Sequence, residues 1–260
     1  MARDMTWRPN ILGWTSIILV LGAWEIVAQF GGVSHFLLPP LSTTLERLWL
    51  DIASGEMITN LALTLARALT GFVLGALIGI AIGVSIARVA IMRWFFDPLL
   101  SLGLPTPKVA FLPIFVLWFG AFDTSNVLMV AFSALFPIAV NATAGVEGVD
   151  RAYLWSARSL GAKRRDLFME IELPAAMPLI FTGLQITLPI ALIVEIVSEM
   201  AMGSKGLGGS ILMNIRFLDS PGVFAGIIAT GIVGSALILS MEQIRNRVLV
   251  WHAETQAQTW

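Results

Sequence analysis

Four long stretches of this chain contain no charged residue: 68–87, 124–146, 173–194 and 220–241. At a rise of about 1.5 Å per residue, each is long enough to cross about 30 Å of hydrocarbon as a helix. The composition agrees, since 57% of the 260 residues are hydrophobic and 13% are charged, whereas an ordinary soluble domain is about 25% charged. With a mean hydropathy of +0.84, the sequence predicts an all-α integral membrane protein.

Two weaker stretches raise the expected number of transmembrane helices to six. One covers about residues 11–30 and is interrupted by Glu25, and the other covers about 98–120 and is interrupted by Lys108 and three prolines. We therefore expect a single domain over residues 1–260. Its six spans are predicted at about 11–30, 61–87, 98–120, 124–146, 175–200 and 220–243.

Lys and Arg are unevenly divided between the two sides that six alternating spans would create. One side has eleven: Arg3, Arg8, Arg88, Arg93, Arg151, Arg158, Lys163, Arg164, Arg165, Arg245 and Arg247. The other side has three: Arg47, Lys205 and Arg216. Because cytoplasmic loops are enriched in positive charge, the first side and both termini are predicted to be cytoplasmic. Residues 147–174 then form a cytoplasmic loop between spans four and five.

Several kinds of function are disfavoured by what the sequence lacks. It has no Cys and only two isolated histidines, His35 and His252, so we expect no metal site and no thiol chemistry. No cluster of potentially catalytic side chains lies at membrane depth, and no catalytic residue is predicted. A phosphate-binding G-x-x-x-x-G-K-[ST] motif is absent, so any ATPase would be a separate chain. The net charge of −1 gives no reason to expect nucleic-acid binding.

The loop 147–174 is predicted to contain two short amphipathic helices joined at Gly161. Apolar residues recur at helical spacing on both sides of this joint: Leu154, Ala157 and Leu160, then Leu167, Phe168 and Ile171. Gly161 can adopt positive φ between the helices, and Pro174 is expected to end the second helix. The alternative is a solvated basic loop that only sets the topology.

The spacing of this loop resembles the EAA loop of binding-protein-dependent ABC importer permeases. Ala157 is followed by three residues, Gly161, nine residues, Ile171, one residue, and Leu173-Pro174. Trp155 and Ser156 stand where that family has Glu and Ala. The resemblance implies that the loop docks into a groove of an ATPase subunit as a coupling helix. It assigns the following residues to ATPase coupling: Ala157, Gly161, Leu167, Phe168, Ile171, Leu173 and Pro174.

Further segments extend this resemblance over roughly residues 60–250. "LPTPKVAFLPIFVLWFG" (104–120), "FPIAVNATAGVEGVD" (136–150) and "EMAMGSKGLGGSIL" (199–212) look like segments of nitrate, sulfonate and taurine importer permeases. The resemblance implies a six-helix type I importer permease (MetI-like) fold in the bacterial cytoplasmic membrane. It also implies a homodimer with two ABC ATPase subunits, which hold ATP and Mg, and an external solute-binding protein, while the permease binds no cofactor. The solute stays open: a nitrate-, sulfonate- or taurine-like compound, an aromatic anion or a vitamin precursor.

Glycines occur at strict four-residue spacing in the second span. Gly71, Gly75, Gly79 and Gly83 share one helix face. The last span has a similar series: Gly222, Gly226, Thr230 and Gly234. Small residues let helix backbones approach closely in lipid, so both faces are predicted to pack against other helices.

Prolines and ionisable residues in spans three and five are the candidates for the transport pathway or its gate. The prolines are Pro105, Pro107, Pro113, Pro178 and Pro189, and the resemblance implies that these two spans line the route. The prolines are expected to produce either bent helices beside a pore or ordinary helix kinks. The ionisable residues are Lys108, Glu195 and Glu199.

Acidic groups at this depth are expected either to pair with Lys108 or Arg67 or to be exposed near the outer surface, before the glycine-rich segment. Glu199 would then hold the outer end of span five against the neighbouring loop. The alternative is a proton- or sodium-driven transporter that uses both carboxyl groups. The glycine-rich segment 203–209 is expected outside, either as a flexible connector or beside a surface where Lys205 and Arg216 contact the binding protein.

Overall fold

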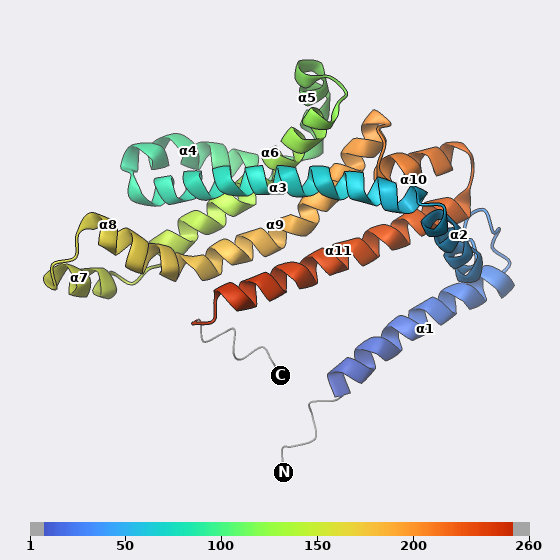
Figure 1. Ribbon diagram of the computed structural model, residues 1–260, viewed down its shortest axis with the longest axis horizontal. Helices are drawn as coiled ribbons and strands as arrows, with labels where there is room; N and C mark the ends of the chain where they lie inside the picture. The colour runs from blue at the N-terminus through green and yellow to red at the C-terminus, as the bar shows by residue number, and fades with distance from the viewer. Residues whose placement is uncertain (1–7, 252–260) are drawn as a thin grey trace, which may run out of the picture.

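The computed structural model describes residues 8–251, and these residues form helices and no strand (Figure 1). Arg3 and His252 lie outside this range. The helices are α1 (Arg8–Phe30), α2 (Leu41–Ala53), α3 (Glu56–Arg88), α4 (Ala90–Gly103), the 3₁₀ turn η1 (Lys108–Phe111), α5 (Leu112–Phe119), α6 (Asp123–Glu147), α7 (Arg151–Ser159), α8 (Arg164–Asp166), the π-helical η2 (Leu167–Glu172), α9 (Leu173–Met202), α10 (Leu207–Arg216) and α11 (Ser220–Val248). The predicted all-α fold is confirmed.

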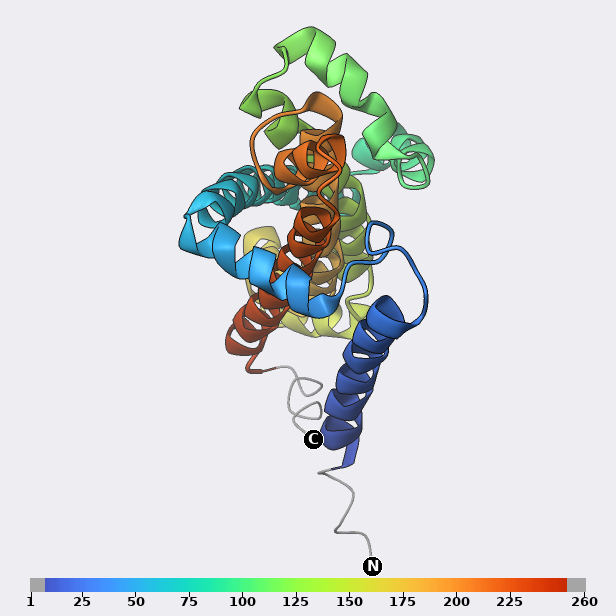
Figure 2. The same ribbon diagram turned by 90° about the vertical axis from the view of Figure 1, so that its right-hand side faces the viewer.

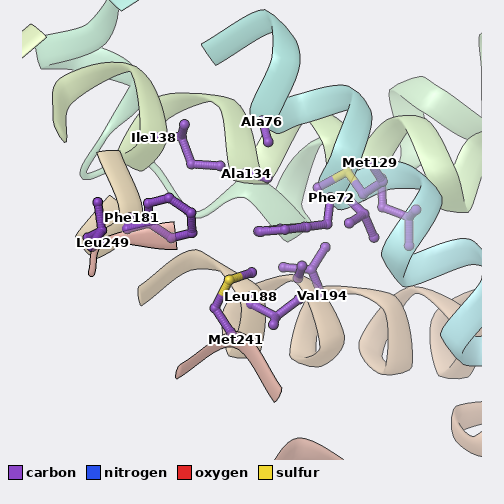
Figure 3. Close-up of a cluster of buried hydrophobic side chains, with 13 residues drawn as sticks. Phe72, Ala76, Met129, Ala134, Ile138, Phe181, Leu188, Val194, Met241 and Leu249 are labelled. Atoms are coloured by element: carbon purple, nitrogen blue, oxygen red, sulfur yellow. The ribbon is translucent and has the colours of Figure 1, made fainter. Parts of the chain in front are cut away.

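Three long helices, α3, α6 and α9, form the centre of the molecule. The glycines of α3 contact α6 in the same chain direction, whereas Gly145 of α6 lies against Ala176 and Gly183 of α9 against Asn141, so α9 runs antiparallel to α6. Buried side chains of all three helices meet in one apolar cluster, which Met241 of α11 also joins (Figure 3).

Four helices in the described range are long and apolar enough to span a membrane. They are Glu56–Arg88, Asp123–Glu147, Arg164–Met202 and Ser220–Val248, and they contain the four uncharged stretches of the sequence. A fifth span exists if the bent pair Ala90–Gly103 and Lys108–Phe119 crosses as one, and α1 contributes a shorter apolar helix, Thr15–Phe30. A total of six spans stays a prediction.

The start predicted for the span at about 98–120 is wrong, whereas a bend at its prolines is present. Its first half begins earlier, at Ala90, and the chain then bends by 100° between the two halves. Pro105 and Pro107 lie in the break, where Pro107 has extended backbone with ψ 99°. Proline donates no backbone hydrogen bond and disfavours helical geometry in the preceding residue, so two prolines so close together interrupt the helix.

The predicted helix end at Pro174 is also wrong. Helix runs without interruption from Arg164 to Met202, with Pro174 in the first turn of α9. The preceding residues, Leu167–Glu172, form a π-helical turn. Such a turn pairs residues five apart and therefore changes which carbonyl lies opposite the proline ring. The loop and the fifth span are consequently one continuous element.

The first helix lies apart from the central helices (Figure 2) and contacts the rest of the protein near α2. Trp24 Nε1 donates a hydrogen bond to the Pro39 carbonyl at 3.0 Å. Glu25 accepts hydrogen bonds from the backbone N–H of Ser42 at 3.2 Å and from its hydroxyl at 2.8 Å. The carboxylate that interrupts the first apolar stretch therefore caps the N-terminus of α2, where the helix dipole favours negative charge.

The loops predicted to share a side lie at one end of the molecule, the left of Figure 1. Arg88 at the end of α3 lies 3.4 Å from Glu172 of η2, and Arg93 of α4 pairs with Glu147 of α6. We call this the arginine-rich end, and the end with α10 the opposite end. That the arginine-rich end faces the cytoplasm stays a prediction.

Candidate functional site

The helix α7 projects from the arginine-rich end and is fixed at both of its ends. Asp150 caps its first turn by accepting a hydrogen bond from the Ala152 N–H at 2.8 Å. At its other end Gly161 has φ +92°, and the N–H of Ala162 donates to the Ala157 carbonyl at 3.0 Å. Because residues with a Cβ rarely adopt such a φ, glycine is what lets the chain turn here. The first predicted loop helix and its joint at Gly161 are both present.

The apolar side chains of α7 and of its C-cap residue differ in burial. Leu154 and Ala157 are partly buried against the rest of the protein. Tyr153, Trp155 and Leu160 are 65%, 64% and 88% exposed. Large apolar side chains gathered on a projecting helix mark a surface for a partner.

Most of the coupling residues after Gly161 attach the loop to the permease instead of facing outward. Leu167 is buried, and Phe168, Ile171, Leu173 and Pro174 are partly buried. The guanidinium of Arg88 lies 4.2 Å from the centroid of the Phe168 ring, a cation–π contact. The sequence pattern did not single out Tyr153 and Trp155 as exposed side chains. Two large aromatic side chains on one short, otherwise mostly polar loop helix are the signal that could have found them.

The four glycines of α3 lie directly against α6. A Cβ placed on each glycine would lie within 2.4–2.8 Å of a backbone oxygen of α6: Val127, Ala131, Leu135 and Ala139 for Gly71, Gly75, Gly79 and Gly83. On α11 the contacts are less uniform, since Gly226 faces Ile211 of α10 and Gly234 lies 3.7 Å from Leu192 of α9. The α3 glycines therefore set the separation of the two central helices.

A buried charged cluster ties three helices together at the opposite end. The Arg67 guanidinium donates to Glu199 at 3.0 Å and to Asp123 at 2.7 Å. Glu195 lies 3.9 Å from the same guanidinium. Both glutamates are fully buried, and Arg67 is 8% exposed. Of the two partners expected for these acids, the structure selects Arg67 and not Lys108.

The same cluster holds the glycine-rich segment after α9. Arg67 also donates to the carbonyl of Lys205 at 2.6 Å, and Glu199 accepts from the N–H of Gly208 at 2.8 Å. Thr64 donates to Glu199 at 2.9 Å and accepts from the Leu207 N–H at 2.9 Å. Glu199 thus lies between the end of α9 and the following loop, as hypothesised. The carboxyl oxygens of Glu195, by contrast, have no hydrogen-bond partner among the described residues.

The candidate pathway residues fall into different places. Pro107 and Lys108 line a cavity of about 440 Å³ with Ser133 of α6 and Ile190 of α9. The Lys108 ammonium lies 5.4 Å from the centroid of the Phe136 ring. The other candidates do not line this cavity: Pro105 is in the preceding turn, Pro113 in the first turn of α5, Pro189 inside α9, and Glu195 and Glu199 in the Arg67 cluster.

The glycine-rich segment also lines a polar hollow of about 670 Å³ at the opposite end. Lys205 contributes to it, together with Glu56 and Asn60 of α3 and Asn214 of α10, whereas Arg216 does not. Of the two basic residues considered for contact with a binding protein, only Lys205 therefore lines this hollow.

Comparison with known families decides the identity of the chain. Residues 75–250 match the family described as "Binding-protein-dependent transport system inner membrane component". The chain belongs to this family. It is a multi-pass membrane permease subunit of an ABC importer. The predicted family and function are confirmed, and the ion-driven alternative is not favoured.

Relatives and solved structures agree with this assignment. The chain is 32% identical to the taurine transport system permease of Escherichia coli K12, over 98% of this chain and 96% of the relative. It is 32% identical to a putative aliphatic sulfonates transport permease of Bacillus subtilis 168, over 92% and 88%, and 30% identical to the riboflavin transport permease of Chloroflexus aurantiacus, over 92% and 89%. A chain of the inward-facing MetNI methionine transporter superimposes with a TM-score of 0.66 at 15% identity, covering 76% of this permease and 98% of that chain.

Proposed function

We propose that two copies of this permease form a homodimeric pathway and work with two ATPase subunits and one external solute-binding protein. The ATPase subunits would hold ATP and Mg²⁺, and the permease would contribute no ATPase site. The family's dependence on a binding protein supports the external partner. The positive charge of the arginine-rich end supports an inward orientation in a bacterial cytoplasmic membrane.

The observation that carries the proposal is the set of exposed aromatic and apolar side chains on α7 and its C-cap. Tyr153, Trp155 and Leu160 are each more than 60% exposed, next to a glycine turn fixed by backbone hydrogen bonds. A projecting helix can bind by inserting into a groove, and aromatic side chains dominate the energy of such contacts. We assign these side chains to the ATPase groove, with Trp155 at the position where the family has Glu.

The continuous helix after α7 provides the mechanical link. It runs from Arg164, at the foot of the loop, to Met202, and Glu199 near its far end is held by Arg67 and Thr64 of α3. A displacement of α7 by the ATPase would therefore be transmitted along α9 to the opposite end of the permease. ATP binding would close the ATPase pair and open the permease outward, and hydrolysis would return it inward.

A matched pair of glycine variants tests the ATPase contact. Gly161 and Gly203 both have positive φ, +92° and +63°, and a Cβ on either would meet nothing within 4 Å. Valine is strained at both positions, but only Gly161 adjoins α7. We expect Gly161→Val to lose the ATPase in pull-downs of the tagged permease from native membranes, and Gly203→Val to retain it. Retention by both variants, or no ATPase with the wild type, would refute the coupling assignment.

For the solute, we propose a small anion such as a sulfonate. Lys108 is the basic residue that lines the cavity between the α4–α5 break, α6 and α9, and its neighbours there include Ile186, Ile190 and Val194. A single cation in an apolar cavity favours a small ligand of opposite charge. The names of two relatives, which specify taurine and aliphatic sulfonates, support the same class.

Uptake by the complete reconstituted transporter tests the solute class. With taurine and an alkanesulfonate as probes, Lys108→Gln should reduce uptake at least about tenfold, since a charge-assisted hydrogen bond contributes about 1.5–3 kcal/mol. Lys108→Arg should retain most of it, and basal ATP hydrolysis should be unchanged in both. Equal uptake by wild type and Lys108→Gln would refute the role of Lys108. Uptake of riboflavin in place of both probes would refute the anion class.

A further inference from the structure

A second hollow, of about 630 Å³, lies at the arginine-rich end between α7 and the ends of the central helices. It is lined by five arginines from four helices: Arg88, Arg93, Arg151, Arg158 and Arg164. We call it the arginine pocket. Its volume lies within the range of about 300–1,000 Å³ typical of small-ligand sites.

The pocket carries an excess of positive charge. Its two carboxylates are already engaged, since Glu147 pairs with Arg93 and Glu172 lies 3.4 Å from Arg88. The other three arginines, which α7 and α8 contribute, form no ion pair with any residue in the range 8–251: Arg151, Arg158 and Arg164. These three exposed arginines line one hollow without a paired carboxylate, so an anion in the hollow would be attracted by all three.

We propose that the arginine pocket binds a phosphate-bearing anion, supplied by the head group of an anionic phospholipid. Guanidinium groups donate two parallel hydrogen bonds to phosphate oxygens, and several arginines can share one phosphate. The assignment of α7 to ATPase coupling does not require such a ligand. The proposal depends neither on the solute nor on the oligomeric state.

The surface beside the pocket favours a lipid as the source. Arg93 lines the pocket from the first turn of α4, where its neighbours Ile91, Trp94 and Phe95 are 71%, 87% and 62% exposed. Aromatic and apolar side chains in this position are typical of the membrane interface. Basic pockets between helices on the cytoplasmic side are suited to anionic head groups, with the acyl chains held in the bilayer.

The pocket and the proposed ATPase surface use different side chains of the same loop. Leu154, Arg151 and Arg158 line the pocket, whereas Tyr153, Trp155 and Leu160 do not line it and are exposed. A head group in the pocket would therefore leave these three side chains accessible to an ATPase.

The chain offers a matched pair of double variants for the test. Arg151→Gln/Arg158→Gln removes two charges that line the pocket, and Lys163→Gln/Arg165→Gln removes two charges of the same loop that do not line it. The full-length protein would be placed in phosphatidylcholine nanodiscs with increasing phosphatidylglycerol, and native mass spectrometry would count the retained phosphatidylglycerol. We expect the pocket variant to bind about 30-fold more weakly, equivalent to about 2 kcal/mol for the lost charge-assisted hydrogen bonds to phosphate. The control should change less than about threefold, because its charges lie outside the pocket and are screened by salt.

A second titration separates the two sources of phosphate. Inorganic phosphate would be added to protein in phosphatidylcholine alone, with the thermal unfolding midpoint as readout. Stabilisation by phosphatidylglycerol that requires the pocket arginines supports the proposal as stated. Stabilisation by inorganic phosphate alone, lost in the pocket variant, retains the anion site but overturns the lipid as its source. Equal losses in both double variants, or no binding of either anion by the wild type, would overturn the site itself.

The single variant Arg164→Gln keeps the test decisive if the pocket double variant fails to fold. Arg164 lies on α8 and is exposed, so its loss is not expected to affect packing. About a fivefold loss of phosphatidylglycerol binding is expected, and a change below about twofold would count against the site.

Discussion

Replacement of Gly75 by alanine tests the packing of the two central helices. A Cβ at this position would lie 2.5 Å from the backbone oxygen of Ala131 and 2.8 Å from the Cβ of Ala134. Ordinary contact begins at 3.4 Å, so the closest approach is about 0.9 Å too short. The obstacle is the backbone of α6, which cannot rotate away as a flexible side chain would. The two helices must therefore separate, or α3 must bend.

The expected change in the free energy of unfolding follows from two opposing effects. Overpacking of a well-packed site costs about 1–3 kcal/mol, whereas Gly→Ala in a helix interior gains up to about 1 kcal/mol. Gly231 in α11 provides the control, because a Cβ there would meet nothing within 4 Å. Since both variants share the helix-propensity gain, Gly75→Ala should be less stable than Gly231→Ala by about 1–3 kcal/mol. Gly75→Leu should prevent assembly altogether.

Unfolding in mixed micelles with increasing SDS, followed by tryptophan fluorescence, measures this difference. The purified wild type and both alanine variants would be compared under identical lipid conditions. If Gly75→Ala and Gly231→Ala differ by less than about 0.5 kcal/mol, the close packing at this glycine is not what holds α3 against α6. Normal assembly and transport by Gly75→Leu would lead to the same conclusion.

Five further substitutions, two of them for comparison, test the charged cluster and α7. Glu199→Gln should cost about 1.5–3 kcal/mol of stability in the same SDS assay, because it removes a buried charge-assisted hydrogen bond. Asp123→Asn should cost less than about 1 kcal/mol, because that carboxylate is 71% exposed, and equal losses would contradict the difference in burial. Gly206→Ala should resemble Glu199→Gln, since its Cβ would lie 2.0 Å from the Glu199 carboxylate at a backbone φ of +136°; a stable variant would mean that the loop is not fixed there. Trp155→Ala should weaken binding of the ATPase to the permease in proteoliposomes about tenfold, while Trp251→Ala, a change at a tryptophan with similar exposure, should leave it intact.

The sequence was sufficient to predict the elements that depend on local properties. Each uncharged stretch lies within one long helix, because a 20-residue apolar segment has no other stable form in a membrane. The turn at Gly161 was equally predictable, since a positive φ requires a residue without Cβ. The predictions that failed concerned places where neighbouring residues alter the effect of a proline. Prolines near residue 105 broke a helix completely, whereas Pro174 did not, because a π turn adjusted the helix before it.

The partners in the charged cluster could not be predicted from the sequence. They depend on how the helices are aligned with one another, which the spacing of residues within one helix does not show. Glu199 and Arg67 are 132 positions apart in the chain, and the sequence allowed Arg67 or Lys108 as the partner. Arg67 is the partner because of how the central helices are aligned. The glycine face fixes α3 against α6 and places Arg67 level with Asp123. The antiparallel helix α9 then brings Glu199 to the same height. A shift of one helical turn would move Arg67 by about 5.4 Å and break the bonds to both carboxylates. The glycines that allow close packing are therefore also what pairs the charges at the far end of the span.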